Sequence, residues 1–227
     1  MVTSVALDPI EKKPLYHFYP GSRILSIGTF GCNLRCDFCQ NWQISQERPP
    51  AQRLEVDHLP EFALRDESIG VAFTYNEPSI WYEYVLDGAK AVQEAGGKVA
   101  LVTNGFISPE PLEELLPHVD ALNIDLKSMD EEYYQKICGG KPGPVLESIR
   151  LAHEHQEVLL EVTHLLVPEQ REPMEDLEKI RDFLTDLDPQ IPLHVSRYFP
   201  QYRMAHAATE ESLLKKAYEY LSEEMPF

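Results

Sequence analysis

Three of the four cysteines in the chain lie close together in one short stretch. Cys32, Cys36 and Cys39 form a C-x3-C-x2-C array. An apolar run at residues 24–27 precedes them and predicts a short buried strand, so the cysteines are expected in the loop at its carboxyl end. Thiolates are ligands for zinc and for iron–sulfur clusters. The spacing therefore predicts that this loop binds a metal.

Two kinds of metal site suit three thiolates on one loop. In a four-iron cluster, three cysteines leave one iron without a protein ligand, and a small molecule can then chelate it. The remaining Cys138 lies far away in the sequence and is expected to be a small buried residue in a separate loop. A structural zinc site is the alternative, with His17 or His58 as the fourth ligand, although zinc sites favour paired C-x2-C motifs. A disulfide framework suits neither this spacing nor a chain of this length.

Apolar runs that alternate with amphipathic segments predict six buried strands joined by helices. Strands of this kind with crossover helices form a parallel sheet. Six strands are too few for a closed eight-stranded barrel, so we expect an α/β fold with a partial, open (β/α)6 barrel. The expected strands are residues 24–28, 69–74, 98–103, 120–126, 158–166 and 191–196, and the expected helices are residues 54–63, 79–95, 109–116, 130–137, 144–155, 176–187 and 209–222.

Polar residues occur at the carboxyl end of every expected strand after the first. In barrels of parallel strands the chemistry takes place at these ends. Because burying an unpaired polar group costs about 1–3 kcal/mol, one shared polar ligand would explain their coincidence. Each residue alone also suits a turn, an ion pair or a core histidine. The residues are Asn76 and Glu77, Thr103 and Asn104, Asn123, Asp125 and Lys127, Glu161, Thr163 and His164, and His194, Ser196 and Arg197.

The cysteine motif resembles the signature of the radical S-adenosylmethionine (SAM) enzymes, C-x3-C-x-aromatic-C after a first strand, with Phe38 as the aromatic residue. The resemblance implies that Cys32, Cys36 and Cys39 hold a [4Fe–4S] cluster whose open iron is chelated by the amine and carboxylate of SAM. It also implies reductive cleavage of SAM to a 5′-deoxyadenosyl radical, which abstracts hydrogen from a substrate. The fold of these enzymes is a partial (β/α)6 barrel, in agreement with the strand count.

Further motifs that resemble this family imply contacts to SAM. Residues 75–78 are similar to its Gly-Gly-Glu-Pro segment, so Glu77 would accept the methionyl ammonium. The Thr-Asn-Gly and Asp-Leu-Lys segments of glycyl-radical activating enzymes stand at residues 103–105 and 125–127, where Lys127 would pair with the carboxylate of SAM. Those enzymes often place a cation-binding aspartate at the position of Val102, so no such cation site is expected. The other expected SAM contacts are Phe38 and Gln40 near the adenine, Asn76, Thr103, Asn104, Asp125, Thr163, His194 and Ser196.

Longer motifs resemble the AmmeMemoRadiSam-system radical SAM enzymes, which are relatives of the pyruvate formate-lyase activating enzymes. They are DPIEKKPLYHFYPGS, SIGTFGCNLRCDFCQNWQIS, TYNEP, EVTHLLVP and HVSRYFPQYRM, without the cysteine-containing N-terminal segment of longer members. The resemblance implies flavodoxin or ferredoxin as electron donor, and a glycyl residue of a partner protein as one candidate substrate. A peptide, a modified nucleotide or a small metabolite is the alternative substrate. Outside this class, an iron–sulfur electron carrier or a zinc-stabilised binding module is the alternative function.

The composition narrows the partners and the location. The chain has 38 acidic against 20 basic residues and a net charge of −18, which disfavours binding to nucleic acids and to anionic membranes. Its 227 residues suit a single radical SAM domain, residues 1–227. We expect residues 1–23 to form an extended arm packed on the outside of the first strand, with Lys12, Lys13 and His17 on the surface. The sequence contains no membrane span or signal peptide, so a cytoplasmic location is expected.

Overall fold

The computed structural model describes residues 1–168 and 173–226 of the chain. Its centre is a seven-stranded sheet with the strands in sequence order, in which β1 pairs antiparallel with β2 and every other neighbouring pair is parallel. The described sheet is not closed, because β1 and β7 are its two edges. The strands are β1 (Ser4–Pro9), β2 (Arg23–Gly28), β3 (Ser68–Phe73), β4 (Lys98–Thr103), β5 (Ala121–Asp125), β6 (Leu159–Leu166) and β7 (Leu193–Arg197).

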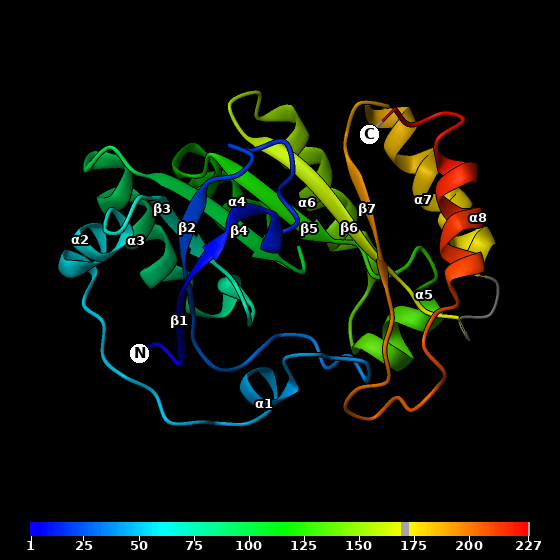
Figure 1. Ribbon diagram of the computed structural model, residues 1–227, viewed down its shortest axis with the longest axis horizontal. Coiled ribbons are helices and arrows are strands. Elements are labelled where there is room, and N and C mark those ends of the chain that lie inside the picture. The colour runs from blue at the N-terminus through cyan, green and yellow to red at the C-terminus, as the bar shows by residue number, and fades with distance from the viewer. Residues whose placement is uncertain (169–172, 227) are drawn as a thin grey trace.

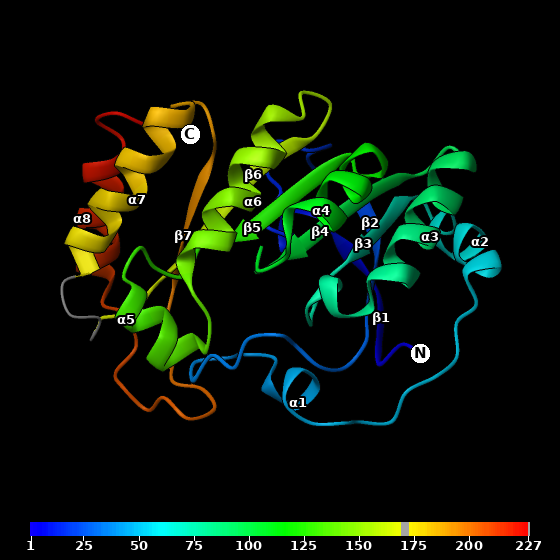
Figure 2. The same ribbon diagram turned by 180° about the vertical axis from the view of Figure 1, so that it is seen from behind.

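Helices cover one face of the sheet, and the opposite face carries the N-terminal arm. Figure 1 looks onto the face with the arm, and Figure 2 looks from behind, where α3, α4 and α6 lie in front of the strands. No helix within residues 1–168 and 173–226 is long and apolar enough to cross a membrane. The α-helices are α1 (Trp42–Ser45), α2 (Leu59–Ala63), α3 (Tyr82–Glu94), α4 (Pro109–Leu115), α5 (Glu131–Tyr133), α6 (Pro142–Glu154), α7 (Pro173–Leu187) and α8 (Glu211–Leu221), with shorter 3-10 turns at Ile10–Lys12, Val56–His58, Pro78–Trp81 and Leu116–His118 and a π-turn at Tyr134–Cys138.

All six strands expected from the sequence are present as β2 to β7, in the predicted order and with ends that shift by a residue or two. The prediction of an open α/β barrel is therefore confirmed. The antiparallel strand β1 was not predicted. It is an edge strand at Ser4–Pro9, and its hydrogen bonds to β2, rather than a long apolar pattern of its own, define it.

The arm does not pack on the outside of the first strand, as the sequence had suggested, because it enters the barrel. Ile10, Leu15 and Phe18 are buried there against three alanines of the sheet, Ala72, Ala100 and Ala121. These alanines are neighbours in the strand register, Ala72 beside Ala100 and Ala100 beside Ala121. Small side chains on three adjacent strands leave the space that the arm fills.

Polar side chains of the sheet hold the backbone of the arm in place. Asn123 Nδ2 donates to the Pro14 carbonyl at 2.8 Å. The carboxylate of the fully buried Glu161 accepts hydrogen bonds from the backbone N–H groups of Tyr16 at 3.1 Å and His17 at 2.9 Å. Asn123 and Glu161 are partners in the register of β5 and β6. The middle layer of the barrel interior is therefore occupied by the chain itself.

His194 belongs to this arm contact, and the structure does not place it with the other expected SAM contacts. Its Nε2 lies 2.5 Å from Glu161 Oε2, and its ring centroid lies 5.1 Å from that of Tyr16. Glu161 and His194 are two of the polar strand residues for which the sequence suggested a shared ligand. The arm supplies their partners instead, because a buried carboxylate must be hydrogen-bonded wherever it lies.

Removing the charge of Glu161 is expected to loosen the arm. Burial raises the pKa of Glu161, but hydrogen bonds from His194 and from the two arm N–H groups lower it further, so the net pKa lies below the ordinary 4.5. This stabilisation is present above the unfolded-state pKa and is lost as the pH falls through the folded-state pKa. We expect Glu161→Gln to lower the free energy of unfolding at neutral pH by about 1–3 kcal/mol.

The measurement is chemical denaturation of the native chain and the variant at neutral and acidic pH. The free energy of unfolding of Glu161→Gln should fall less on acidification than that of the native chain. Glu157→Gln, at an exposed position nearby, should follow the native chain. Equal losses on acidification in the native chain and in Glu161→Gln would contradict the assignment.

Candidate active site

A cavity of about 580 Å³ lies at the carboxyl ends of the parallel strands. The cysteine loop, the ends of β3 to β7 and the N-terminal arm line it. The sequence-predicted site residues that line it are Cys32, Cys36, Phe38, Cys39, Gln40, Asn76, Glu77, Thr103, Asn104, Asp125, Lys127, Thr163 and Ser196. Sequence reasoning missed Lys12, Lys13 and Pro14, which also line it, because only the fold brings the arm to this cavity. It also missed Tyr75, which lines the cavity just after β3.

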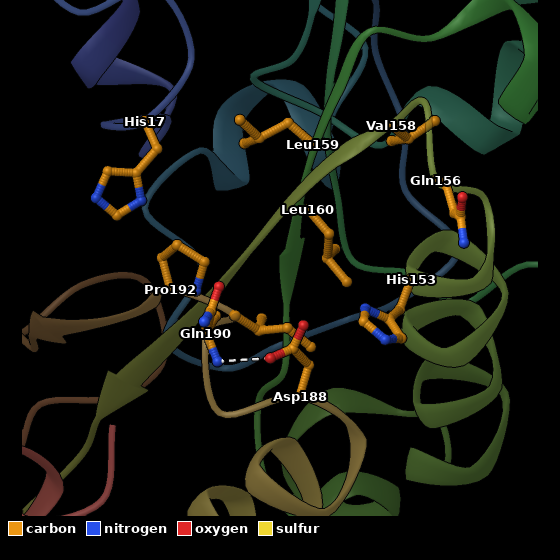
Figure 3. Close-up of a pocket in the computed structure, with 10 residues that line it drawn as sticks. His17, His153, Gln156, Val158, Leu159, Leu160, Asp188, Gln190 and Pro192 are labelled. Carbon is orange, nitrogen blue, oxygen red and sulfur yellow. Dashed lines mark hydrogen bonds between the residues drawn. The ribbon is translucent and has the colours of Figure 1, made fainter. Parts of the chain in front are cut away.

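A second cavity, of about 460 Å³, lies near the amino ends of β6 and β7. Figure 3 shows His17 and His153 on opposite sides of it, with Asp188 Oδ1 accepting a hydrogen bond from the backbone N–H of Gln190 at 2.8 Å. None of the expected cluster or SAM residues lines this cavity. Because barrel enzymes carry their chemistry at the carboxyl ends of the strands, the larger cavity is the candidate active site.

The backbone and one asparagine side chain fix the start of the cysteine loop. Gly28 ends β2, where a Cβ atom would lie only 2.5 Å from the Thr74 carbonyl oxygen. From the neighbouring strand end, Asn76 Oδ1 accepts a hydrogen bond from Thr29 N at 2.9 Å, and Asn76 Nδ2 donates to the Gly31 carbonyl at 3.1 Å. Asn76 therefore positions the cysteine loop, in addition to lining the cavity.

The second half of the cysteine loop is tied to the turn that carries Cys138. Arg35 N donates to the Cys138 carbonyl at 2.7 Å, and Asp37 N donates to the Ile137 carbonyl at 3.0 Å. The side chains of Cys36 and Cys138 lie in the same buried cluster and are close enough to affect each other's pKa, and their residues are 8% and 0% exposed. The prediction that Cys138 is buried is confirmed, and its neighbour is one of the three loop cysteines.

The other two thiols have polar neighbours that suit thiolates. Cys32 Sγ accepts hydrogen bonds from Leu34 N at 3.4 Å and from Asn104 Nδ2 at 3.5 Å. Cys39 Sγ lies 3.1 Å from Ser45 Oγ. Burial raises the pKa of Cys32 to about 12 and also raises the pKa of Cys39. A metal that binds these two groups must therefore displace their protons.

Glu77 is a buried carboxylate, only 2% exposed, surrounded by donors from its own wall of the cavity. Its Oε1 accepts from Ser79 N at 3.0 Å and from Thr103 Oγ1 at 2.7 Å, and its Oε2 accepts from Asn104 N at 2.8 Å. Burial raises the pKa of Glu77 above its usual value, although these hydrogen bonds oppose the shift. A carboxylate has about four acceptor positions, so one remains for a ligand.

Lys127 and Asp125 form an ion pair at the carboxyl end of β5, with Lys127 Nζ 2.6 Å from Asp125 Oδ2. Burial lowers the pKa of Lys127, but the negative charges of Asp125 and of the Cys36 thiolate raise it more, so the net pKa lies above the ordinary value. Its backbone N–H donates to the Tyr134 hydroxyl at 3.2 Å. This lysine is therefore a fixed cation beside the cysteine loop.

Two buried residues outside the cavity hold the loop that carries Lys127. His164 Nδ1 donates to the Leu126 carbonyl at 3.0 Å, and Asp176 Oδ1 accepts from Met129 N at 2.7 Å. His164 Nε2 and Asp176 Oδ2 are buried without a hydrogen-bond partner among the described residues. The predicted strand-end histidine thus faces the helix layer and acts on the cavity through the backbone on either side of Lys127.

If Lys127 pairs with the carboxylate of SAM, as the resemblance implies, replacing His164 should weaken the binding of SAM. His164→Leu removes the donor to the Leu126 carbonyl and should lower SAM affinity about tenfold, a loss of about 1.4 kcal/mol. His164→Asn places an amide N–H near the position of Nδ1 and should recover most of the affinity. Anaerobic calorimetry of SAM binding to the cluster-loaded chain measures both variants. Equal affinities in the Leu and Asn variants would rule out positioning through this hydrogen bond.

The family model of the radical SAM superfamily matches residues 26–184, most of the chain. The chain belongs to the radical SAM superfamily. Radical SAM proteins bind a [4Fe–4S] cluster and SAM, so the cofactors expected from the cysteine motif are confirmed at the level of the superfamily. The zinc-stabilised module and the simple electron carrier were the alternatives, and the match favours neither.

Curated relatives include members with and without an assigned activity. The uncharacterized protein MJ0808 of Methanocaldococcus jannaschii is 42% identical over 207 residues, which are 89% of this chain and 61% of that protein. The pyruvate formate-lyase-activating enzyme of Clostridium pasteurianum is 28% identical over 167 residues, 69% of this chain and 67% of the enzyme. The chain therefore spans about three fifths of MJ0808 and two thirds of the activating enzyme.

Solved structures of radical SAM proteins share the fold. SuiB of Streptococcus suis bound to SAM has a TM-score of 0.69 at 16% identity, over 86% of this chain and 45% of SuiB. A domain of a pyruvate-formate lyase-activating enzyme from Bacteroides vulgatus has a TM-score of 0.56 at 22% identity, over 68% of this chain and 94% of that domain. At these identities the likeness supports the fold class alone.

The residues of the larger cavity fit the cofactors of the superfamily. Three thiols from one loop share the cavity with the buried carboxylate of Glu77 and the partly buried ammonium group of Lys127. Within the described ranges, no three His, Cys, Asp or Glu side chains converge as a site for a single metal ion. The donor set is instead three separate thiols in one loop, and thiolates are the ligands that iron–sulfur clusters use.

Proposed function

We propose that this chain is a radical SAM enzyme of the activating type, which uses the larger cavity to abstract hydrogen from a substrate. In this proposal Cys32, Cys36 and Cys39 hold the [4Fe–4S] cluster. The cluster and SAM supply the chemistry of the superfamily, a primary carbon radical made by one-electron reduction of the sulfonium. The observation that carries the proposal is that the three thiols, Glu77 and Lys127 line one cavity at the carboxyl ends of the strands.

The two ends of the methionyl group would meet oppositely charged walls of the cavity. Glu77 would accept a charge-assisted hydrogen bond from the ammonium group, at the acceptor position that its three protein donors leave open. Lys127 would pair with the carboxylate group of SAM while it keeps its ion pair with Asp125. This arrangement orients SAM toward the cysteine loop, because both residues are fixed by their own hydrogen bonds.

An aromatic wall would hold the adenine. Phe38 is buried between the second and third cluster cysteines and stacks on Tyr133, with ring centroids 6.5 Å apart and an interplanar angle of 20°. Gln40 lines the same cavity. Flat rings favour offset stacking, and an amide side chain can donate to and accept from an adenine edge.

A protein or peptide is the substrate class that the comparisons favour, with a glycyl residue as the specific candidate. The name of one group of relatives, pyruvate formate-lyase-activating enzyme, indicates that they act on another protein. The structure of SuiB has been solved with the precursor peptide SuiA bound. Flavodoxin or ferredoxin is the proposed electron donor. The net charge of −18 disfavours RNA as the alternative substrate.

The test is the anaerobic formation of 5′-deoxyadenosine. The chain is loaded with iron and sulfide, reduced with dithionite and mixed with SAM, and the product is separated by chromatography. We expect 5′-deoxyadenosine to form, and to carry deuterium when a peptide with deuterated glycine is the hydrogen donor. A four-iron cluster that neither binds nor cleaves SAM would overturn the proposal. Cleavage without transfer from peptides would direct the search to small molecules.

A further inference from the structure

The proposed function assigns one part of the cavity wall no role in holding the cluster or SAM. It is contributed by the N-terminal arm and by the residue before Asn76, and consists of Lys12, Lys13, Pro14 and Tyr75. Lys13 is only 1% exposed, although the sequence suggested a surface group. A buried ammonium group beside an enzymatic cavity needs partners, and those partners show what this wall can bind.

Asp8 is the centre of a small charged network, named here the Asp8 network, with Lys12, Lys13 and Tyr75. Lys12 Nζ lies 2.8 Å from Asp8 Oδ1, and Lys13 Nζ lies 2.7 Å from Asp8 Oδ2. The Tyr75 hydroxyl donates to Asp8 Oδ2 at 2.5 Å. Burial raises the pKa of Asp8, but these three hydrogen bonds lower it further, so the carboxylate stays ionised. Two ammonium groups therefore share one carboxylate, and the network carries a net positive charge.

Lys13 has the geometry of a ligand-binding group. Its Nζ lies 4.4 Å from the centroid of the Tyr75 ring, and Asp8 is its hydrogen-bond acceptor among the described residues. An ammonium group has three donors, so donors remain for a molecule in the cavity. Burial lowers the pKa of Lys13 although Asp8 opposes the shift. An anionic ligand would therefore compensate for solvation that the ammonium group has lost.

The backbone of Tyr75 is strained at this wall. Tyr75 has a φ angle of +71°, a left-handed conformation that costs a non-glycine residue about 1–2 kcal/mol. In this conformation the Tyr75 hydroxyl contacts Asp8 and its ring faces the Lys13 ammonium group. Strain of this kind is concentrated at functional sites. Here the strained residue lies between the end of β3 and Glu77.

We propose that Lys13, supported by Asp8, Lys12 and Tyr75, binds a carboxylate group of the substrate. The inference rests on the proposed function and narrows its substrate class to a peptide segment that carries a carboxylate close to the carbon that loses hydrogen. Such a carboxylate belongs either to an acidic side chain or to a peptide C-terminus. The net charge of −18 disfavours the binding of acidic peptides to the protein surface in general. The positively charged network in the cavity would therefore be the place where a peptide carboxylate binds.

The experiment uses the full chain with an oxidised cluster, which prevents turnover. Saturating SAM is present, so that Lys127 is already occupied. Three peptides are titrated by anaerobic calorimetry: N-acetyl-Gly-Asp-amide, N-acetyl-Gly-Gly with a free C-terminus, and N-acetyl-Gly-Asn-amide. We expect at least one carboxylate peptide to bind at least about tenfold more tightly than the neutral peptide, a difference of about 1.4 kcal/mol. The stronger of the two carboxylate peptides identifies the source of the carboxylate.

Matched lysine variants test whether Lys13 is responsible. Lys13→Met should remove the preference for the carboxylate peptide. Lys12→Met should reduce it less, because that side chain is largely exposed. Lys216→Met, at an exposed position on α8, should keep it in full. If Lys13→Met does not fold, the double variant Asp8→Asn/Lys13→Met removes both charges of the buried pair together, and it should also lose the preference.

The outcomes separate this inference from the proposed function. If SAM does not bind to the cluster-loaded chain, the proposed function itself fails. If SAM binds but the three peptides bind equally, or neither carboxylate peptide binds, the inference about Lys13 is wrong. A preference that survives in Lys13→Met or in the double variant also overturns it.

Discussion

Replacing Cys36 with alanine is expected to abolish the iron–sulfur cluster and all cleavage of SAM. Cys36 is the most enclosed of the three loop cysteines, and a cluster held by two thiolates loses a third of its protein ligands. Cys138→Ala should keep the cluster, because this thiol only packs against Cys36 and is no part of the cysteine motif. Iron and sulfide content, visible absorbance and 5′-deoxyadenosine formation measure the effect.

The contact between the two thiols requires one further variant. Because Cys138 is buried beside Cys36, it could serve as a substitute ligand when Cys36 is absent. The double variant Cys36→Ala/Cys138→Ala excludes this substitution and should contain no cluster. A four-iron cluster in the double variant would remove Cys36 from the ligand set.

Replacing Glu77 with glutamine is expected to leave the cluster in place and to reduce the affinity for SAM by at least about tenfold, a loss of about 1.4 kcal/mol. The amide NH2 group would face one of the donors that Glu77 now accepts from, Ser79 N, Thr103 Oγ1 or Asn104 N. We therefore also expect the free energy of unfolding to fall by about 1–3 kcal/mol. Calorimetry with SAM, iron analysis and chemical denaturation separate the three effects.

The pH dependence of SAM binding gives a second readout for Glu77. Burial raises its pKa, so the ionised form that attracts an ammonium group becomes populated only as the pH rises through this raised value. The affinity of the native chain for SAM should increase with pH in the acidic range, and that of Glu77→Gln should not. Glu83→Gln, at an exposed position in the first turn of α3, should match the native chain. Unchanged affinity in Glu77→Gln would remove this residue from the site.

Local patterns predicted the parallel part of the fold and the residues at its strand ends. The apolar runs of β2 to β6 are buried from end to end or nearly so, and such runs are recognisable from the sequence alone. A polar residue at the end of such a run must lie at one edge of a parallel sheet. Glu77, Asn104 and Lys127 therefore lie in one cavity, as the strand order requires.

The role of the arm was not predictable in the same way, because it depends on contacts between distant parts of the chain. Lys13 is buried only because Asp8 pairs with it and because the backbone beyond it is held by Asn123 and Glu161. Glu161 and His194 were correctly placed inside the barrel by their strands, but their partner is the backbone of the arm. A sequence pattern of alternating polar residues does not distinguish such a partner from a ligand.

The seating of the arm has a consequence for the order of folding during synthesis. The arm is made before the strands that it contacts, and the hydrogen bonds that hold it join residues 109, 144 and 145 positions apart. At a synthesis rate of about 5–20 residues per second, several seconds pass before Glu161 leaves the ribosome. Contacts between such distant segments form late in folding. The part of the cavity wall that contains Lys13 is therefore completed only after the cysteine loop and the first four parallel strands have been made.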